Sequence, residues 1–394
     1  MKNPFNAQGP SDPRYYADRD ELLSIFKQNV LSVKESKGVT KPVNLSIMGR
    51  WGIGKTSTLY KFKDIMENEC ENARIFSSII TLKPASCTDA DTFSASIIES
   101  MFRDYSTTAK LPGKIRSFIS EELNLLENWR LSKISPVNPE IERKHKQIKA
   151  INFKDALVRF WKKIDAADFD LAVIMLDDIH YALGERPDLL YDLRTDMQAL
   201  SAEKTRYAFV ITGPSSVYPE MRDKAEPFTR LFEKFTLEPF DLNGTKELIE
   251  KPLKAEKISL KISKEVMEHV QQITEGHPYF ITLVMRDLLN KKQQGKLTMR
   301  EFEQLYPNLM HHFAKMKFED DLSKATDAEK GILFKMASST KIDLSPTEAG
   351  ARNQPVLLDR LVKKELVIKE SRGKYRLYNK LFKEYLKHLP PSNR

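Results

Sequence analysis

The stretch SIMGRWGIGKTSTLY, residues 46–60, decides the fold. It holds Gly49, Gly54, Lys55 and Thr56 in the pattern G-x-x-x-x-G-K-[ST], between a strand-like segment and a helix-forming one. Glycines let the backbone N–H groups of such a loop point at phosphate oxygens, and the start of the following helix offers further N–H groups to the same anion. The stretch therefore predicts a phosphate-binding P-loop rather than a chance glycine turn.

The side chains of this loop have separate expected tasks. Lys55 should reach the β- and γ-phosphates of ATP, and the Thr56 hydroxyl should take one position around Mg²⁺. We expect the loop to bind the nucleotide through Gly49, Trp51, Gly52, Ile53, Gly54, Lys55, Thr56 and Ser57. ATP or ADP, together with Mg²⁺, are the cofactors that this pattern predicts.

Strands and helices alternate around the loop, which predicts an α/β fold with a parallel sheet and helices on both faces. The segment LAVIMLDD is almost continuously apolar, as is typical of the middle of a parallel sheet. The segment VNLSIM alternates apolar and polar residues, which is unusual for a central strand. The four predicted strands lie at residues 43–48, 73–82, 171–178 and 206–213.

Two acids end the apolar strand, and ligands of open α/β sheets bind at the carboxyl ends of strands. We expect Asp177, on a strand neighbouring the P-loop strand, to hold Mg²⁺ through water, and Asp178 to position or activate the attacking water. The alternative is an ordinary polar strand end. An aspartate is one methylene shorter than a glutamate, which withdraws its carboxylate by ~1.5 Å and predicts an ATPase that is slow.

Two further residues complete the predicted catalytic set of Lys55, Asp177, Asp178, Thr212 and Arg230. Thr212 ends the next strand and is placed to bond the γ-phosphate or the attacking water, or simply to form the turn before Gly-Pro. Arg230 would reach the γ-phosphate of a neighbouring subunit as an arginine finger, although an exposed structural arginine is the favoured interpretation.

Changes of pattern along the chain suggest five regions. We expect a lead-in and helix at 1–40, the P-loop core at 41–241 with a helical insertion at 103–152, a helical lid at 242–295, a linker at 296–325 and a winged helix at 326–394. The winged helix is expected because the last region reads as helix, helix, helix, strand, turn, strand, helix.

The predicted winged helix carries basic residues. Arg360, Lys363 and Lys364 fall on one face of its third helix, opposite a leucine stripe, and Arg372 and Lys374 lie on the wing. The net charge of +9 also favours a polyanionic partner. Double-stranded DNA is therefore a predicted partner, and the alternative is an internal packing module whose charges are merely solvated.

Composition excludes several other classes of protein. Two cysteines cannot form a disulfide framework or a metal cluster, and they suggest a reducing compartment. No apolar run approaches the length of a membrane span, and the first residues show no secretory h-region. We therefore expect a cytoplasmic protein without a membrane partner.

The motifs YYADRDELL, GRWGIGKTS, MLDDIH, LFEKFTLEPF, TEGHPYFI and YRLYNKLFKEYL occur in the order found in one group of ATPases. The chain resembles the archaeal and bacterial ATPases related to AAA+ origin-binding initiators, and especially the branch that grades into the signal-transducing (STAND) NTPases. The resemblance implies that Tyr16 and Arg19 flank the adenine, that Pro278 packs near the base and that His277 faces the phosphates. The chain departs from the family pattern at Asp18, where such families usually have glycine.

Two further departures concern hydrolysis. The lid has GHP where initiators carry a sensor arginine, and no arginine follows Thr212. Both features point away from replication initiators and toward the signalling ATPases. The basic third helix and wing nevertheless favour an ATP-dependent switch that binds DNA through its winged helix, and this is the function we expect. The alternative is a protein-interaction switch in signalling or defence, without direct DNA binding, and in either case ATP binding is a candidate trigger of self-association.

Overall fold

A computed structural model describes residues 3–36, 41–70, 73–107, 152–184, 186, 188–352 and 354–389. Most of the helical insertion expected at 103–152 lies outside the described residues. The chain divides into two compact units. The sheet unit comprises Arg19–Gly49 and Thr58–Thr236, and the lid–wing unit comprises Met1–Asp18, Arg50–Ser57 and Leu237–Arg394. The expected region 1–40 is thus shared between the two units.

The sheet has five strands in the order β2-β3-β4-β1-β5, and the pairs β2–β3, β3–β4 and β4–β1 are parallel. This confirms the predicted α/β fold. One detail of the prediction is wrong, because β4 lies between the P-loop strand β1 and the strand β3 that carries Asp177. The strands are β1 (Asn44–Gly49), β2 (Ile75–Thr81), β3 (Leu171–Asp177), β4 (Tyr207–Gly213) and β5 (Phe232–Leu237).

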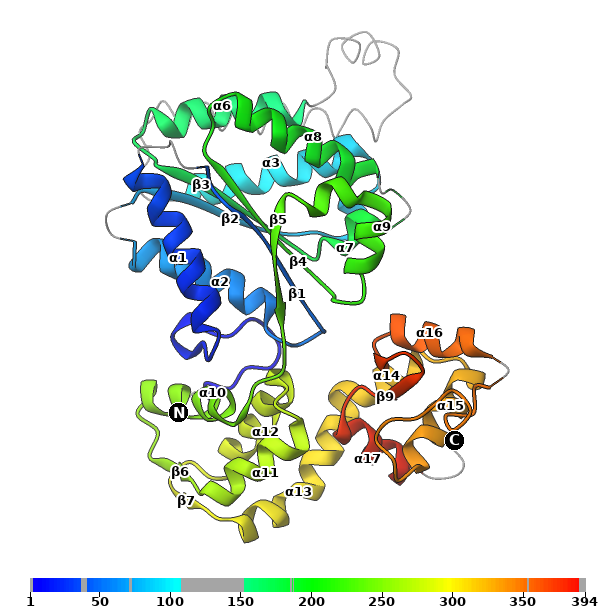
Figure 1. Cartoon of the computed structure of the whole chain (residues 1–394). Coiled ribbons are helices and arrows are strands. Elements are labelled where there is room, and N and C mark those ends of the chain that lie inside the picture. Colours follow the sequence, from blue (N-terminus) through cyan, green and yellow to red (C-terminus); the bar gives the residue numbers. More distant parts are fainter. Residues whose placement is uncertain are drawn as a thin grey trace, which may run out of the picture. The chain divides into compact units, whose positions relative to one another are not determined.

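Helices cover both faces of this sheet, as Figure 1 shows. On one face lie α1 and α2, whose Phe26 and Phe62 rings stack at 3.7 Å between centroids. On the other face α3, α6 and α8 pack against one another, and the short α7 and α9 complete the unit. The helices are α1 (Asp20–Glu35), α2 (Lys55–Asn68), α3 (Ala90–Thr107), α6 (Phe153–Asp165), α7 (His180–Leu183), α8 (Asp188–Ala202) and α9 (Tyr218–Thr229).

Burial on both faces explains the strand patterns. Every residue of β3 is buried, which matches its continuous apolar sequence. The alternating β1 is buried too, and Ser46 is fully covered. The polar residue in β1 therefore does not mark an exposed face of the sheet, since helices lie over both sides.

The lid holds α10, α11 and α12, but it is not wholly helical as we expected. Two short strands, β6 and β7, pair in parallel, and three residues are too few to give a strand pattern in sequence. The expected linker is also mostly helical. These elements are α10 (Leu242–Ala255), β6 (Leu260–Ile262), α11 (Lys264–Thr274), α12 (Pro278–Lys291), β7 (Gly295–Leu297), α13 (Met299–Phe313), a π-helical turn (Ala314–Phe318) and α14 (Glu319–Ser323).

A winged helix follows, as predicted, with one difference. The second of the three expected helices is replaced by turns at residues 346–350, and Leu344 forms an antiparallel bridge with Tyr375 beside the wing. The elements are α15 (Asp327–Ser338), α16 (Pro355–Lys363), β8 (Val367–Ser371), β9 (Lys374–Leu377) and α17 (Lys380–His388).

One hydrophobic core joins the lid to the winged helix. Phe280 of the lid, Phe318 of the π-helical turn and Phe382 of α17 belong to the same buried cluster. The N-terminal segment, expected to be an extended lead-in, joins it through Phe5 and Ala17. Within the described part of the chain, no helix is long and apolar enough to cross a membrane.

Candidate nucleotide-binding site

The P-loop joins β1 to α2 and depends on glycine at position 52. Gly52 has φ +73°, in the left-handed region that favours glycine. A Cβ atom there would stand 2.9 Å from the Cβ of Tyr279 and 3.0 Å from Cε1 of His277. The lid therefore approaches the loop so closely that a side chain at position 52 has no room. Gly54, with φ +105°, also requires glycine, because of its backbone conformation alone.

The cationic and hydroxyl groups expected to bind phosphate lie in the first turn of α2. Lys55 begins this helix, and its ammonium donates a hydrogen bond of 3.0 Å to the carbonyl of Arg50 in the same loop. The Ser57 hydroxyl accepts a bond of 3.0 Å from the backbone N–H of Ser11. The N-terminal segment thus reaches the phosphate-binding turn, and this contact has no signal in the sequence.

The acids at the end of β3 are joined by a single hydroxyl. Thr212, on the adjacent strand β4, donates to the buried carboxylate of Asp177 and accepts from the backbone N–H of Asp178 at 3.2 Å. In this structure the hydroxyl proton is donated to Asp177, so Thr212 positions the two acids. A bond from Thr212 to the γ-phosphate or to the attacking water stays a prediction.

The oxygen ligands expected for the metal suit Mg²⁺. This ion prefers hard oxygen donors and commonly takes one or two carboxylates together with phosphates and several waters. The buried Asp177 carboxylate, fixed by Thr212, and the Thr56 hydroxyl are donors of this kind. They belong to different units, so joint binding of a metal stays a prediction.

Arg230 lies at the C-terminal end of α9, and its exposed side chain forms an ion pair with Glu226 one turn earlier. This agrees with an ordinary surface arginine. A role as an arginine finger would need a neighbouring subunit and stays a prediction.

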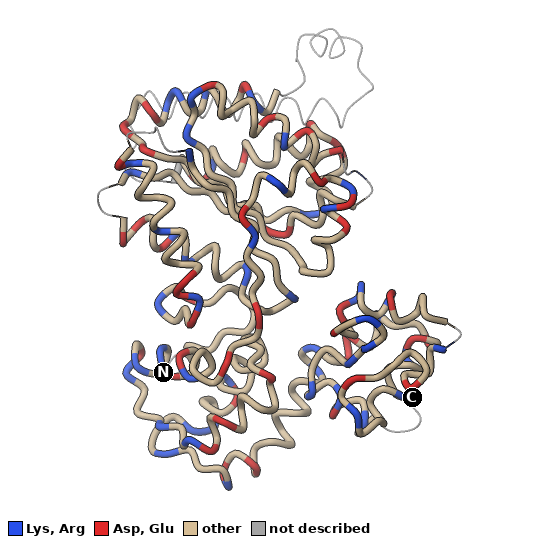
Figure 2. The backbone as a smooth tube through the Cα atoms, viewed as in Figure 1, with Lys and Arg blue, Asp and Glu red and all other residues tan. Residues whose placement is uncertain are grey.

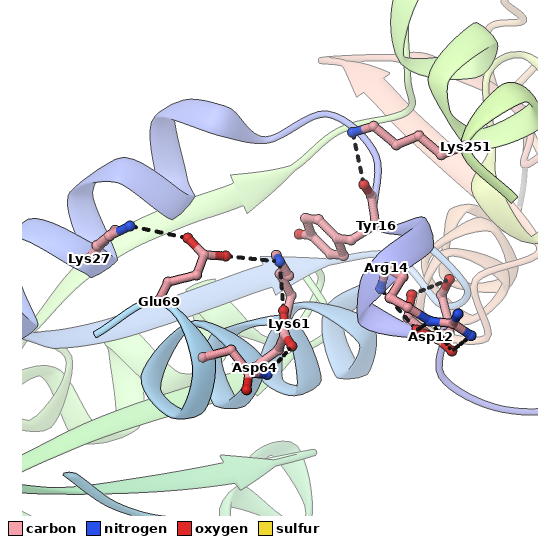
Figure 3. Close-up of polar contacts among 10 residues, drawn as sticks. Asp12, Arg14, Tyr16, Lys27, Lys61, Asp64, Glu69 and Lys251 are labelled. Carbon is pink, nitrogen blue, oxygen red and sulfur yellow. Dashed lines mark hydrogen bonds and ion pairs between the residues drawn. The ribbon is translucent and has the colours of Figure 1, made fainter. Parts of the chain in front are cut away.

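The residues expected around the base lie at a strained turn. Asp18 and Arg19 have φ +59° and +70°, so both adopt the left-handed conformation, which explains why related families have glycine at the Asp18 position. Figure 3 shows Lys251 reaching the carbonyl of Tyr16, at 3.0 Å, and Arg14 paired with Asp12. The N-terminal segment is thereby fixed to the lid.

A separate charged group is formed by α1 and α2. The ammonium of Lys61 lies 2.7 Å from Asp64 and 3.2 Å from Glu69, and Lys27 of α1 contacts Glu69 from the other side, also at 3.2 Å (Figure 3). These charges are used within the sheet unit. They tie α1 to α2, the helix that begins at the P-loop.

His277 faces the backbone of the P-loop. It is buried at the N-terminus of α12, immediately before Pro278, and its Nε2 lies 3.1 Å from the carbonyl oxygen of Trp51. Burial, with a smaller effect from the Arg50 charge, lowers the pKa of His277 to about 3. The ring is therefore neutral, with its proton on Nε2, because a carbonyl can only accept.

The tip of the P-loop also touches the winged helix. The backbone N–H of Trp51 donates to Glu365 at 3.3 Å, and the Arg50 guanidinium donates to the Tyr378 carbonyl at 3.4 Å. The Lys317 ammonium lies 4.0 Å from the centre of the Trp51 ring, a cation–π contact. Burial lowers the pKa of Arg50, and the neighbouring Arg376 lowers it further. These contacts join residues more than 250 positions apart, so no local sequence pattern indicates them.

The predicted DNA-binding residues divide into two kinds. Arg360 and Lys363 are exposed on α16, and Arg372 and Lys374 are exposed around the wing, where Figure 2 shows basic and acidic residues interspersed. Lys364 is different, because its ammonium donates a bond of 2.6 Å to the buried carboxylate of Glu329. Lys364 thus already pairs with an acid of the winged helix itself, and a contact of its ammonium with DNA stays a prediction.

Comparison with known proteins shows which family model and which solved folds this chain resembles. Residues 28–206 match the KAP family P-loop domain. The fold is similar to that of the Walker-type ATPase PABY2304 of Pyrococcus abyssi, with a TM-score of 0.61 and 15% identity over 97% of this chain and 99% of that one. The ADP form of the Aeropyrum pernix ORC2 protein is similar at a TM-score of 0.54 and 15% identity, over 99% of this chain and 94% of that one. No curated protein matched the sequence.

The chain therefore carries a P-loop NTPase domain in a fold shared with the Walker-type ATPase of Pyrococcus abyssi and the Aeropyrum pernix ORC2 protein. The resemblance to origin-binding ATPases is confirmed at the level of the fold. The motifs did not suggest the KAP family, and the closer placement beside the signal-transducing NTPases stays a prediction.

Proposed function

We propose that this protein is an ATP-dependent molecular switch that hydrolyses ATP slowly and binds double-stranded DNA through its winged helix. The observation that carries the proposal is the contact of the P-loop tip with Glu365 and Tyr378 of the winged helix and with His277 of the lid. A nucleotide bound by this loop competes with or reinforces these contacts. Its presence therefore alters the free energy of holding the winged helix against the loop.

The chemistry rests on residues at the carboxyl ends of the strands. Mg²⁺, when bound, would neutralise the charge that develops on the phosphates. Lys55 would bind the β- and γ-phosphates, Asp177 would hold the metal through water, and Asp178 would orient the attacking water. Thr212 keeps both acids in place, so its loss should misplace them together.

The DNA surface of this proposal consists of Arg360 and Lys363 on α16 and Arg372 and Lys374 around the wing. All four side chains are exposed, and the described part of the chain offers none of them a hydrogen bond or an ion pair. Exposed lysines and arginines on a recognition helix and wing suit phosphate contacts. Lys364 is left out because its charge stabilises Glu329.

The proposal is tested by measuring duplex DNA binding, by fluorescence anisotropy, without nucleotide, with ADP and with a non-hydrolysable ATP analogue. The affinity should differ between nucleotide states in the parent and become independent of nucleotide in Lys55→Ala, which removes the point charge on the phosphates. The control is Lys63→Ala, which changes a partly exposed lysine farther along α2. Calorimetry measures the nucleotide affinity of both proteins. If Lys55→Ala bound the nucleotide as tightly as the parent does, the P-loop assignment would be refuted.

A protein-interaction switch is the second candidate, and one observation favours it. Val356 and Ile342 on the winged helix are 59% and 63% exposed, and the carboxylate-bearing Asp359 shares the exposed side of α16 with Arg360. Exposed apolar groups and an acid suit a protein surface better than a phosphate backbone. Light scattering with and without ATP distinguishes the candidates, since assembly without duplex binding would support this one.

A further inference from the structure

A cleft of about 670 Å³ lies in the sheet unit and is not used by the proposed ATPase mechanism. Its walls are the chain leading into β1, the last turns of α6 and α8, the first residues of β4 and the residue before β5. Ligand sites for small molecules have volumes of ~300–1,000 Å³, so the cleft is large enough for one.

This cleft lies at the opposite end of the sheet from Thr212 and Asp177. It opens at Tyr207, the first residue of β4, whereas Thr212 and Asp177 stand at the carboxyl ends of β4 and β3. The extended strand rises six times by about 3.3 Å between Tyr207 and Gly213, which separates them by ~20 Å. Because β1 runs parallel to β4, the P-loop also follows the far end of the sheet.

The lining carries an excess of positive charge. Arg206 and Asp165 neutralise each other in an ion pair of 2.5 Å, and the guanidinium lies 4.9 Å from the centre of the Trp161 ring, which fixes it in place. Lys41 and Lys204 remain, both exposed and without a hydrogen bond or ion pair to any described residue. Among the described residues, Asp165 is the one acid of the lining, and Arg206 compensates its charge. The cleft therefore carries two uncompensated positive charges, those of Lys41 and Lys204.

About half of the cleft lining is apolar, and the rest is polar. The side chains of Trp161, Met197 and Phe209 are at least nine-tenths buried and form part of the lining, its apolar floor. Gln198 and Ser201 face the same cleft, and their side-chain polar groups have no hydrogen-bond partner in the described part of the chain. A ligand would thus meet two ammonium groups, an amide and a hydroxyl over an apolar surface.

We propose that this cleft binds a small organic anion that combines an acidic group with a flat apolar body. The acidic group is recognised by Lys41 and Lys204, with Ser201 and Gln198 as hydrogen-bonding groups. The apolar body covers the floor, and this contact separates such a ligand from inorganic anions. The site is distinct from the nucleotide site and would stand even if the proposed function did not.

The test uses the full chain with ADP and Mg²⁺ present, and 8-anilinonaphthalene-1-sulfonate as a fluorescent probe of this chemistry. Reversing both charges in Lys41→Glu/Lys204→Glu should weaken probe binding about tenfold or more, because attraction becomes repulsion at short range. Ser201→Trp, which fills the cleft and keeps both lysines, should also weaken it. Circular dichroism verifies that each variant is folded.

The matched control is Lys162→Glu/Lys163→Glu, an equal charge change on α6 outside the cleft lining. Equal weakening by control and cleft variants would mean nonspecific adsorption and overturn the proposal, as would failure of the probe to bind the parent. Naphthalene-1-sulfonate should displace the probe at about a tenth or less of the concentration that sodium sulfate needs. Equal potency would overturn the role of the apolar floor.

Discussion

Replacing Lys364 by methionine should destabilise the winged helix much more than the same change at Lys363. Glu329 is fully buried, and its carboxylate accepts bonds of 2.6 Å from the Lys364 ammonium and 2.8 Å from the backbone N–H of Thr326. Removing one partner of a buried ion pair costs ~3–5 kcal/mol. The Lys364 side chain is 30% exposed, and hydration of the vacated position reduces the expected cost to about 2–3 kcal/mol.

The pH dependence gives the same contact a second signature. Burial alone would raise the pKa of Glu329, but the bonds from Lys364 and Thr326 outweigh it and hold the pKa below its usual value. A carboxyl with a lowered folded-state pKa adds stability above its unfolded pKa, ~4.3, and this contribution is lost as the pH falls through the folded-state pKa. The difference between parent and Lys364→Met should therefore be largest near pH 7 and shrink below ~pH 4.

The assay is urea unfolding, with hydrogen exchange followed by mass spectrometry on peptides from α15 and α16. Lys363→Met is the control, because its side chain is exposed and has no partner in the described part of the chain, so a change within ~0.5 kcal/mol is expected. Adding Glu329→Gln to Lys364→Met should recover part of the loss by removing the unpaired charge. Equal stability of the two methionine variants would refute the reasoning.

Three further predictions concern ATP hydrolysis, DNA binding and the stability of the P-loop region. Asp178→Asn should keep ATP affinity within about twofold but slow phosphate release at least ~10-fold, and an unchanged rate would remove this residue from the chemistry. Arg360→Ala/Lys363→Ala should reduce the log–log salt slope of duplex binding by up to ~1.8, at about 0.9 per phosphate contact; an unchanged slope would exclude these side chains from DNA contact. Gly52→Ala should lower the free energy of unfolding by ~1–2 kcal/mol because of the left-handed backbone alone, and by more if the lid cannot move away. Calorimetric unfolding identical to that of the parent would contradict the close approach of His277.

Local patterns account for much of what could be predicted. The P-loop is recognisable because its glycines, Lys55 and Thr56 must lie within a few residues of one another in the chain to surround one phosphate group. The buried β3 is recognisable because a strand covered on both faces is apolar throughout. The winged helix could be predicted from the order of its helices and strands. The one local difference is that turns replace the expected second helix at residues 346–350.

The neighbours of the site could not be predicted in this way. Parallel strands are joined through helices, so chain order does not give strand order, and β4 came to lie between β1 and β3. Its Thr212 could then bond both acids, which no spacing in the sequence indicates. The partner of the Lys364 ammonium could not be predicted either. The helical period shows which residues share one side of α16, but not which buried acid of another helix lies opposite them.

By itself, the sequence determined the groups that can meet a phosphate, the apolar strands and the presence of a winged helix, since these depend on residues close together in the chain. The tertiary structure alone decided which groups are already engaged: Thr212 with the two acids, Lys364 with Glu329, and the P-loop tip with His277 and Glu365. Hydrogen bonds and ion pairs act over a few ångströms, and only folding brings residues that are 34 to 314 positions apart within that range.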